Sequence, residues 1–191
     1  MPSRALALWD SAQQRELDRL EAAHLAVRGS GRSAGDPLSD AYIVLLAAHF
    51  QQFCRDLHSE AIDFLAASAP HIQSIVDMAL RQGRQLDRGN ATPSSLGADF
   101  GRLGLDLWAE LRGRDGRTAA CGARLEQLNL WRNAVAYRDF QFSPRTSATL
   151  VGTGRTLAFA RSCRSSCREL APHLDAVVAS HLGARLGHRP W

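Results

Sequence analysis

The chain has 191 residues, 45% of them hydrophobic, which suits one globular domain, or one compact domain with an extra helix. It has no run of about 18 uncharged apolar residues, and charge comes too early for the apolar core of a signal peptide, so we expect a cytoplasmic protein with no membrane partner. The net charge of +4 is carried by arginine alone, because the sequence contains no lysine.

Helical periodicity predicts an all-α protein, since alternating strand patterns are nearly absent. We expect a first helix over Ser3–Val27, followed by a loop rich in Gly, Ser and Pro. Its candidate core positions are Leu6, Trp9, Leu17, Leu20 and Leu25. We interpret residues 1–36 as an N-terminal helix and loop that extend the main domain, residues 37–182. Residues 183–191 are interpreted as a C-terminal tail.

The next two helices are predicted on either side of Pro70. The first begins near Ser39 and has the longest apolar stripe in the chain, formed by Tyr42, Leu46, Phe50, Phe53, Leu57 and Phe64 or Leu65. The second runs over residues 71–86, before the turn-rich "DRGNATPSS". Its expected apolar side consists of Ile72, Ile75, Val76, Ala79 and Leu80.

A fourth helix is predicted over residues 95–113, capped by Ser94 or Ser95. It contains Gly97, Gly101 and Gly104, each of which costs about 1 kcal/mol of helix propensity relative to Ala. No strand precedes these glycines, as a dinucleotide-binding fingerprint would require. We therefore interpret them as sites of close approach between helices.

The last two helices are predicted over residues 118–137 and 156–182, joined by an irregular loop or a short hairpin. Cys163 and Cys167 share a face of the second, but the further ligand pair of a zinc site is missing. The other cysteines, Cys54 and Cys121, are scattered, so a disulfide framework is not indicated. We expect reduced cysteines that pack as small apolar residues, with no metal and no cofactor.

The charge is distributed unevenly. Residues 1–70 hold six arginines against nine acidic residues, a net charge of −3, whereas residues 132–168 hold seven arginines against Asp139 alone, a net charge of +6. An anionic partner such as RNA is the functional interpretation, with Arg138, Arg145 and Arg155 as candidate RNA-binding residues. A solvated, arginine-rich surface explains the same pattern.

The stretch "LNLWRNAVAYRDF" raises a more specific question. Arg132 falls on the stripe of Leu125, Leu128 and Val135 that otherwise indicates a buried helix face. A charge there needs a partner or a function. One interpretation is a carboxylate on a neighbouring helix or across a dimer interface. The other is a functional site.

The long helix "AYIVLLAAHFQQFCRDLHSEAIDFL" followed by "LEQLNLWRNAVAYRDF" resembles the HEPN superfamily, nearest to its RiboL-PSP-HEPN and MAE_28990-like branches, over about residues 37–182. The resemblance implies a bundle of about five to six helices, preceded here by an extension helix. It also implies a homodimer in which two motifs form one metal-independent endoribonuclease site, in bacterial toxin, defence or RNA-metabolism systems. The implied site residues are Arg132, Asn133 and, at the position of the motif histidine, Tyr137.

The tyrosine divides the functional hypothesis, because a phenol is a poor proton acceptor at neutral pH. One hypothesis is an RNA-directed protein whose nuclease site is altered, with His58, supported by Arg55 and Glu60, as the candidate substitute for the motif histidine. A solvated charged face also explains that cluster. The other is a non-catalytic dimerisation or interaction module, a regulator or partner subunit. The partners expected are RNA or a nucleotide, a second copy, and an antitoxin or other protein.

Overall fold

The computed structural model describes residues 1–27 and 37–191, and the regular structure in these ranges is helical, without a strand. This confirms the predicted all-α class. The loop predicted after residue 27 lies outside the described residues. In chain order the elements are α1 (Arg4–Leu8), the π-helical turn η1 (Trp9–Gln13), α2 (Gln14–Val27), α3 (Pro37–Ala67), the 3₁₀ turn η3 (Pro70–Ile72), α4 (Gln73–Arg81), the 3₁₀ turn η4 (Gln85–Asp87), α5 (Pro93–Gly101), α6 (Leu107–Arg114), α7 (Thr118–Tyr137), α8 (Pro144–Thr149) and α9 (Leu157–Leu186).

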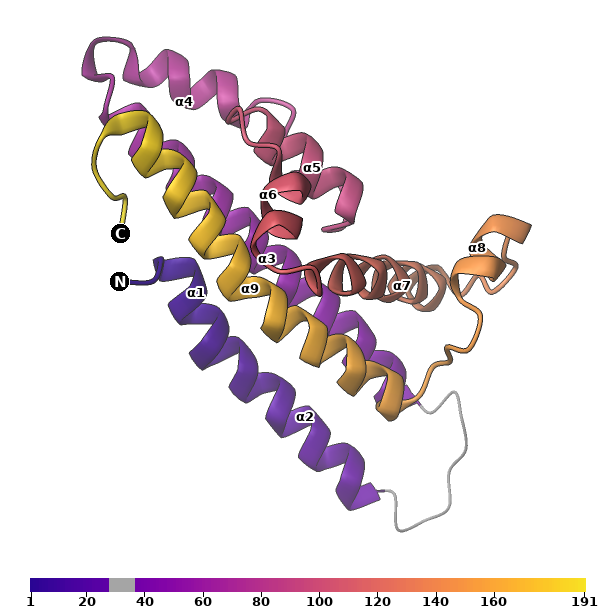
Figure 1. The fold of residues 1–191 in the computed structure, drawn as a ribbon. Helices are drawn as coiled ribbons and strands as arrows, with labels where there is room; N and C mark the ends of the chain where they lie inside the picture. The colour runs from indigo at the N-terminus through magenta and orange to yellow at the C-terminus, as the bar shows by residue number, and fades with distance from the viewer. Residues whose placement is uncertain (28–36) are drawn as a thin grey trace.

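The longest helices pack as a bundle (Figure 1). Helices α3 and α9 lie against each other, α1 and α2 pack along α3, and α7 contacts both α3 and α9. The shorter α4, α5 and α6 occupy the other side of α3 and the C-terminal half of α9. No helix in the described ranges combines the length and apolar character that crossing a bilayer requires.

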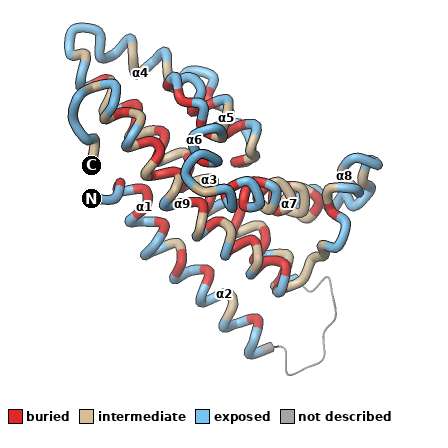
Figure 2. The backbone as a smooth tube through the Cα atoms, in the orientation of Figure 1, coloured by how far each residue is buried: buried red, intermediate tan, exposed pale blue. Residues whose placement is uncertain are grey.

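The stripe of α3 is the centre of the hydrophobic core, as predicted. Its first five predicted members are almost completely buried: Tyr42, Leu46, Phe50, Phe53 and Leu57. Phe64 and Leu65, near the end of the helix, are half-buried. Figure 2 shows buried positions concentrated along α3, α7 and α9, where these helices lie close together. The burial of α3 on this stripe fixes the rotation of the helix about its axis, and therefore which residues its remaining faces present.

The N-terminal helix belongs to the same core, which corrects its interpretation as an extension. Trp9 and Leu17 are fully buried, and the Trp9 ring meets Phe50 edge to face at 5.4 Å between centroids. Leu25, by contrast, is exposed, so its predicted core position was wrong. Packing also crosses the boundary predicted at residue 182, because Trp191 packs against the core and its Nε1 donates to Asp175.

A buried polar network fastens α2 to the rest of the bundle. The Arg164 guanidinium of α9 donates to the Gln14 side chain at 2.8 Å, to the Asp18 carboxylate at 2.6 Å and to the Tyr42 hydroxyl at 3.2 Å. These acceptors satisfy the Arg164 guanidinium, which would be strongly destabilising if it were buried without partners.

Helix α4 is shorter and more exposed than predicted. The chain turns at Gly83, whose φ of +77° suits glycine, and only then does Leu86 enter the core. Within the segment expected to be apolar and packed, Ile75 is 60% exposed and Ile72 is 50% exposed, and no residue of α4 is buried. The prediction of a packed face was wrong at Ile72, Ile75 and Ala79, which are exposed, whereas Val76 and Leu80 are half-buried and Leu80 packs against the core.

The predicted fourth helix is two helices, α5 and α6. The chain breaks at Gly104, whose φ is +77°. Thr92, rather than Ser94 or Ser95, is the N-cap of α5: its hydroxyl accepts the Ser95 N–H at 3.1 Å in a capping box. The close approach predicted for the glycines holds at Gly97, where an added Cβ would lie 3.3 Å from the Trp108 ring.

The predicted bounds of α7 are confirmed, and α9 runs four residues beyond its predicted end at Leu182. The segment between them contains a short helix, α8, in place of the expected hairpin or irregular loop, with Ser143 as its N-cap. All four cysteines are buried and unpaired, in keeping with their interpretation as small packing residues.

Replacement of Trp9 by Ala tests whether the N-terminal helix is part of one cooperative core. We expect Trp9→Ala to lower the free energy of unfolding by about 3–5 kcal/mol, because it leaves a cavity against Phe50 and Phe53. The matched control is Leu8→Ala at the neighbouring, 51% exposed position, with an expected change of about 0.5 kcal/mol or less. Urea denaturation followed by circular dichroism measures both, and equal losses would contradict the packing.

Candidate nucleic-acid interface

The C-terminal end of α7 carries the three residues of the predicted motif. Helix α7 ends where Arg138 adopts a left-handed conformation (φ 55°), and the Asp139 N–H returns to the Ala134 carbonyl at 3.1 Å. Arg132 and Asn133 lie in the last turns, both half-buried, and Tyr137 is the final residue, with 75% of its surface exposed.

These three residues share a polar cavity of about 430 Å³ with the loop between η4 and α5. The structure therefore brings together the predicted motif and a set of residues that the sequence did not indicate. The full lining consists of Gln51, Asp87, Arg88, Gly89, Asn90, Thr92, Arg132, Asn133 and Tyr137. The guanidinium groups of Arg88, from the loop, and Arg132, from α7, thus line the same cavity, among side-chain amides and hydroxyls.

Arg132 is held by neutral groups. Its Nη1 donates to Asn133 Oδ1 at 3.1 Å, and the same oxygen accepts the Asn90 side-chain amide at 2.7 Å. No carboxylate in the described ranges pairs with Arg132. Within one chain, this rules out a described carboxylate as the partner considered for Arg132, so the guanidinium retains donors and a charge for an external anion.

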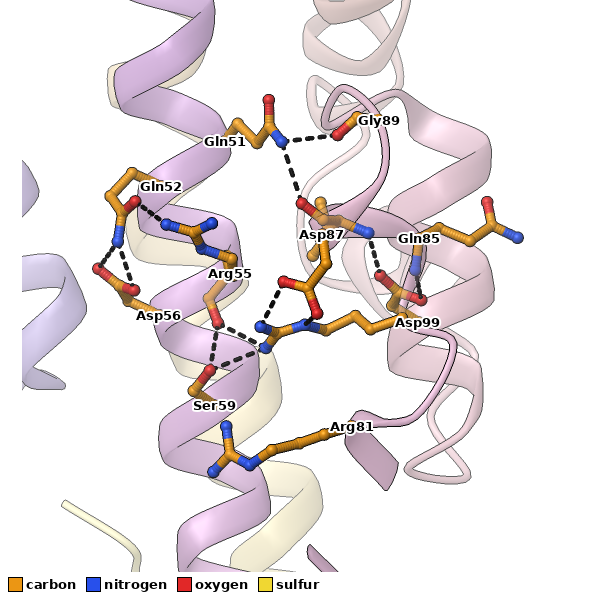
Figure 3. A network of polar contacts seen from close by, with 12 residues as sticks. Gln51, Gln52, Arg55, Asp56, Ser59, Arg81, Gln85, Asp87, Gly89 and Asp99 are labelled. Carbon is orange, nitrogen blue, oxygen red and sulfur yellow. Dashed lines mark hydrogen bonds and ion pairs between the residues drawn. The ribbon is translucent and has the colours of Figure 1, made fainter. Parts of the chain in front are cut away.

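A buried carboxylate holds the start of the cavity loop (Figure 3). Asp99 of α5 accepts the backbone N–H groups of Gln85 and Leu86, each at 2.8 Å. From the other side, Gln51 of α3 donates its amide group to the Leu86 carbonyl at 3.0 Å and to the Gly89 carbonyl at 2.6 Å. The loop backbone is therefore fixed by side chains from two helices.

Arg84 adds a third attachment. This buried guanidinium donates to Asp87 at 2.7 and 3.0 Å, to the Ser59 hydroxyl at 2.8 Å and to the Arg55 carbonyl at 3.2 Å. The hydrogen bonds from Arg84 lower the pKa of Asp87. Although Asp87 lines the cavity, its charge is already compensated, whereas the side chain of Arg88 beside it has no hydrogen-bond or ion-pair partner among the described residues.

The proposed substitute cluster lies in the scaffold rather than at the cavity. His58 is fully buried, with Nε2 3.0 Å from the Asp99 carbonyl and its ring edge to face with Phe100. Arg55 bonds to Gln52, and Glu60 accepts the N–H of Ala5 at 2.7 Å. A solvated charged face does not describe His58, and no histidine of the described ranges lines the cavity.

Much of the basic segment is neutralised inside the chain. Arg155, a predicted RNA-binding residue, pairs with Asp40 at 2.8 Å and stacks on Phe140 at 4.3 Å. Arg161 pairs with Glu21 at 2.6 Å, as Arg164 does with Asp18. The other predicted RNA-binding residues, Arg138 and Arg145, are exposed and form no ion pair with a described residue.

Gln51, Arg88 and Asn90 were not predicted as site residues. "DRGNATPSS" was interpreted only as a turn, and turn composition carries no signal for which side chains face a distant helix.

Comparisons of the chain with protein-family models, with curated proteins and with solved structures found no match.

The burial of His58 predicts an acid-sensitive fold. Burial lowers the pKa of His58 to about 4 from 6.5, so the unfolded chain binds a proton between these pH values that the folded chain does not. Stability from the neutral ring is present above about pH 6.5 and falls by up to roughly 3 kcal/mol as the pH drops to about 4. We expect His58→Gln, which keeps a donor for the Asp99 carbonyl, to flatten this part of the profile.

Urea denaturation of both proteins at several pH values between 4 and 7 measures the difference. Carboxylates titrate in both proteins and cancel in the comparison. If the two profiles run parallel, His58 does not carry a depressed pKa in the folded chain.

Proposed function

We propose that this chain is an RNA-directed protein of the HEPN type, and that the cavity at the end of α7 binds an RNA phosphate through Arg132 and Arg88. The observation that carries the proposal is the half-buried Arg132 guanidinium, which bonds a neutral amide and has no carboxylate partner among the described residues. Withdrawing a cation from water without an anion is unfavourable, so a bound phosphate would supply the missing charge.

The surroundings of Arg132 suit this ligand. Arg88 provides a second cation, Asn133 provides an amide, and the Asp87 carboxylate is occupied by Arg84. Exposed Arg138 follows directly on α7, and Arg145 lies on α8, where both extend the basic surface along a longer RNA. Arg155 contributes less in this proposal, because Asp40 already neutralises it.

The proposed chemistry is metal-independent cleavage that is weak or lost. Cleavage needs a group that takes a proton from a 2′-hydroxyl and one that returns a proton to the leaving oxygen. Tyr137 occupies the motif position, a phenol is a poor proton acceptor at neutral pH, and no described histidine lines the cavity. The same observation favours a second candidate function, a non-catalytic HEPN module that acts as a regulator or partner subunit.

The proposal includes a homodimer with two motifs facing each other, as the HEPN resemblance implies, and an antitoxin or other protein as a further partner. Tyr137, exposed at the end of α7, would lie at the junction of the two copies. Bacterial toxin, defence and RNA-metabolism systems are the proposed setting.

RNA affinity should depend on salt through Arg132. We expect Arg132→Ala to weaken binding of single-stranded RNA and to reduce the slope of log affinity against log salt by roughly 0.7, the loss of one phosphate contact. The matched control is Arg112→Ala, an exposed arginine of α6 outside the cavity, which should keep the slope. Fluorescence anisotropy across a salt series measures both; binding indifferent to salt would refute the phosphate site.

Restoring the motif histidine should restore cleavage. We expect the unmodified protein to cut RNA slowly or not at all in the presence of a chelator, and Tyr137→His to raise cleavage by roughly 10²-fold or more, because a positioned acid or base contributes 10² to 10⁴. Arg132→Ala in that background should abolish the gain. A gel assay with labelled RNA measures the rates.

Circular dichroism and light scattering accompany the assay, to show that each variant is folded and whether it is dimeric. Tyr137→Phe is the control for loss of the hydroxyl alone. A folded, RNA-binding Tyr137→His variant that remains inert would favour the non-catalytic module. Rapid cleavage by the Tyr137→Phe variant would mean that another residue transfers the proton.

A further inference from the structure

The directions of the hydrogen bonds at the cavity are fixed for its side-chain amides, and they determine what each amide can offer a ligand. Gln51 contacts two backbone carbonyls, those of Leu86 and Gly89, at 3.0 and 2.6 Å. A carbonyl only accepts, so both contacts must be made by the Gln51 NH₂ group. Figure 3 shows the Gln51 amide oxygen pointing away from these carbonyls, and Gln51 lines the cavity.

The same reasoning determines the orientation of the side-chain amides of Asn133 and Asn90. Arg132 is a donor only, so the Asn133 atom 3.1 Å from its Nη1 is the carbonyl oxygen. That oxygen also lies 2.7 Å from the Asn90 side chain, which must therefore contribute its NH₂ group. Asn90 is left with a carbonyl oxygen, and Asn133 with an NH₂ group, that bond no described residue.

The cavity lining is thus divided by chemistry. Its donors are the guanidinium groups of Arg88 and Arg132 and the Asn133 amide, which suit a phosphate. Its uncommitted amide acceptors are the Asn90 and Gln51 oxygens, and the Tyr137 hydroxyl can both donate and accept. The Asp87 carboxylate is bound to Arg84 and the Thr92 hydroxyl caps α5, so neither competes for the same role.

We propose that the cavity selects nucleotides whose base carries an exocyclic amino group, such as cytosine or adenine, over uracil. This inference rests on the proposed function and names the substrate class of that site. The phosphate is held by Arg88 and Arg132, while the Asn90 and Gln51 oxygens each accept one hydrogen of the amino group. The volume of about 430 Å³ suits one nucleotide.

Uracil cannot donate a hydrogen bond to both of these acceptors. Its imide offers a single N–H, and that N–H is flanked by two carbonyl oxygens. If one protein oxygen accepts the N–H, the other faces a uracil carbonyl, an acceptor against an acceptor, and stays unsatisfied. Because Asn90 and Gln51 each use their NH₂ group on the protein, neither amide can turn over to present a donor without breaking its present bonds.

The pair 5′-CMP and 5′-UMP tests the inference, because the two ligands share phosphate, ribose and ring size. We expect the full-length protein to bind CMP about tenfold more tightly than UMP by calorimetry. For the same reason, 5′-AMP should bind more tightly than 5′-IMP, which carries an oxygen in place of the amino group. Short oligo(C) and oligo(U) repeat the comparison and show whether an RNA chain or only a free nucleotide is selected.

Asn90→Ala should bring the ratio of CMP to UMP affinity toward one, since it removes one acceptor. The ratio is taken within one protein, so a general weakening of phosphate binding cancels. Arg112→Ala, outside the cavity, should keep the ratio.

Two results would overturn the inference in distinguishable ways. If CMP and UMP bind equally and both lose affinity in Arg132→Ala, the phosphate site stands and selection by the amide oxygens is wrong. If neither nucleotide nor RNA binds, the proposed phosphate site fails, and the base selection fails with it.

Discussion

Burial of the α3 stripe is the constraint from which the candidate site follows. Phe50, Phe53 and Leu57 must face the core, so the rotation of α3 is not adjustable. The helix then presents Gln51 and Ser59 toward the segment after α4, where they bind Gly89 and Arg84. The polar loop of the cavity is therefore positioned by the burial of the apolar stripe on α3. A substitution in the stripe that rotates α3 would displace Gln51 and Ser59, and the loop with them.

Charge in this chain is arranged by pairing between distant segments more than by local excess. The acidic N-terminal part and the basic C-terminal part meet in the fold: Asp18 and Glu21 of α2 pair with Arg164 and Arg161 of α9. A net charge of +6 over residues 132–168 consequently overstates what a partner encounters. What distinguishes Arg132 is that its nearest partners are neutral, in a half-buried place where solvent screens little.

The sequence predicted those features that depend on a single helix. The periodicity of α3, the bounds of α7 and the shared face of Asn133 and Tyr137 are properties of one segment, and these were predicted correctly. The break at Gly104 and the exposed face of α4 were missed, because each depends on what a neighbour leaves uncovered. The contribution of Arg88 to the cavity was missed for the same reason.

His58 illustrates the opposite error, a residue predicted to be functional that the fold buries. Its neighbours in sequence, Arg55 and Glu60, favoured a polar face, and spacing alone could not show that α5 covers it with Phe100 and the Asp99 carbonyl. Burial by a segment about 40 residues away turned a candidate proton-transfer group into part of the scaffold. Its depressed pKa is a consequence of that packing and makes the fold sensitive to acid.

Under the proposed function, binding and cleavage are separable in this fold. Of the phosphate-binding groups, Arg88 lies on a loop fixed by Asp99 and Gln51, and Arg132 and Asn133 lie on α7 of the same chain, so binding requires no ordering of that loop. The proton-transfer position, Tyr137, lies at the exposed edge. A two-fold dimer would bring the same residue from the second copy, because symmetry duplicates the motif. A second copy of the motif would therefore add cations and a second phenol around an RNA, but the motif itself contributes no imidazole.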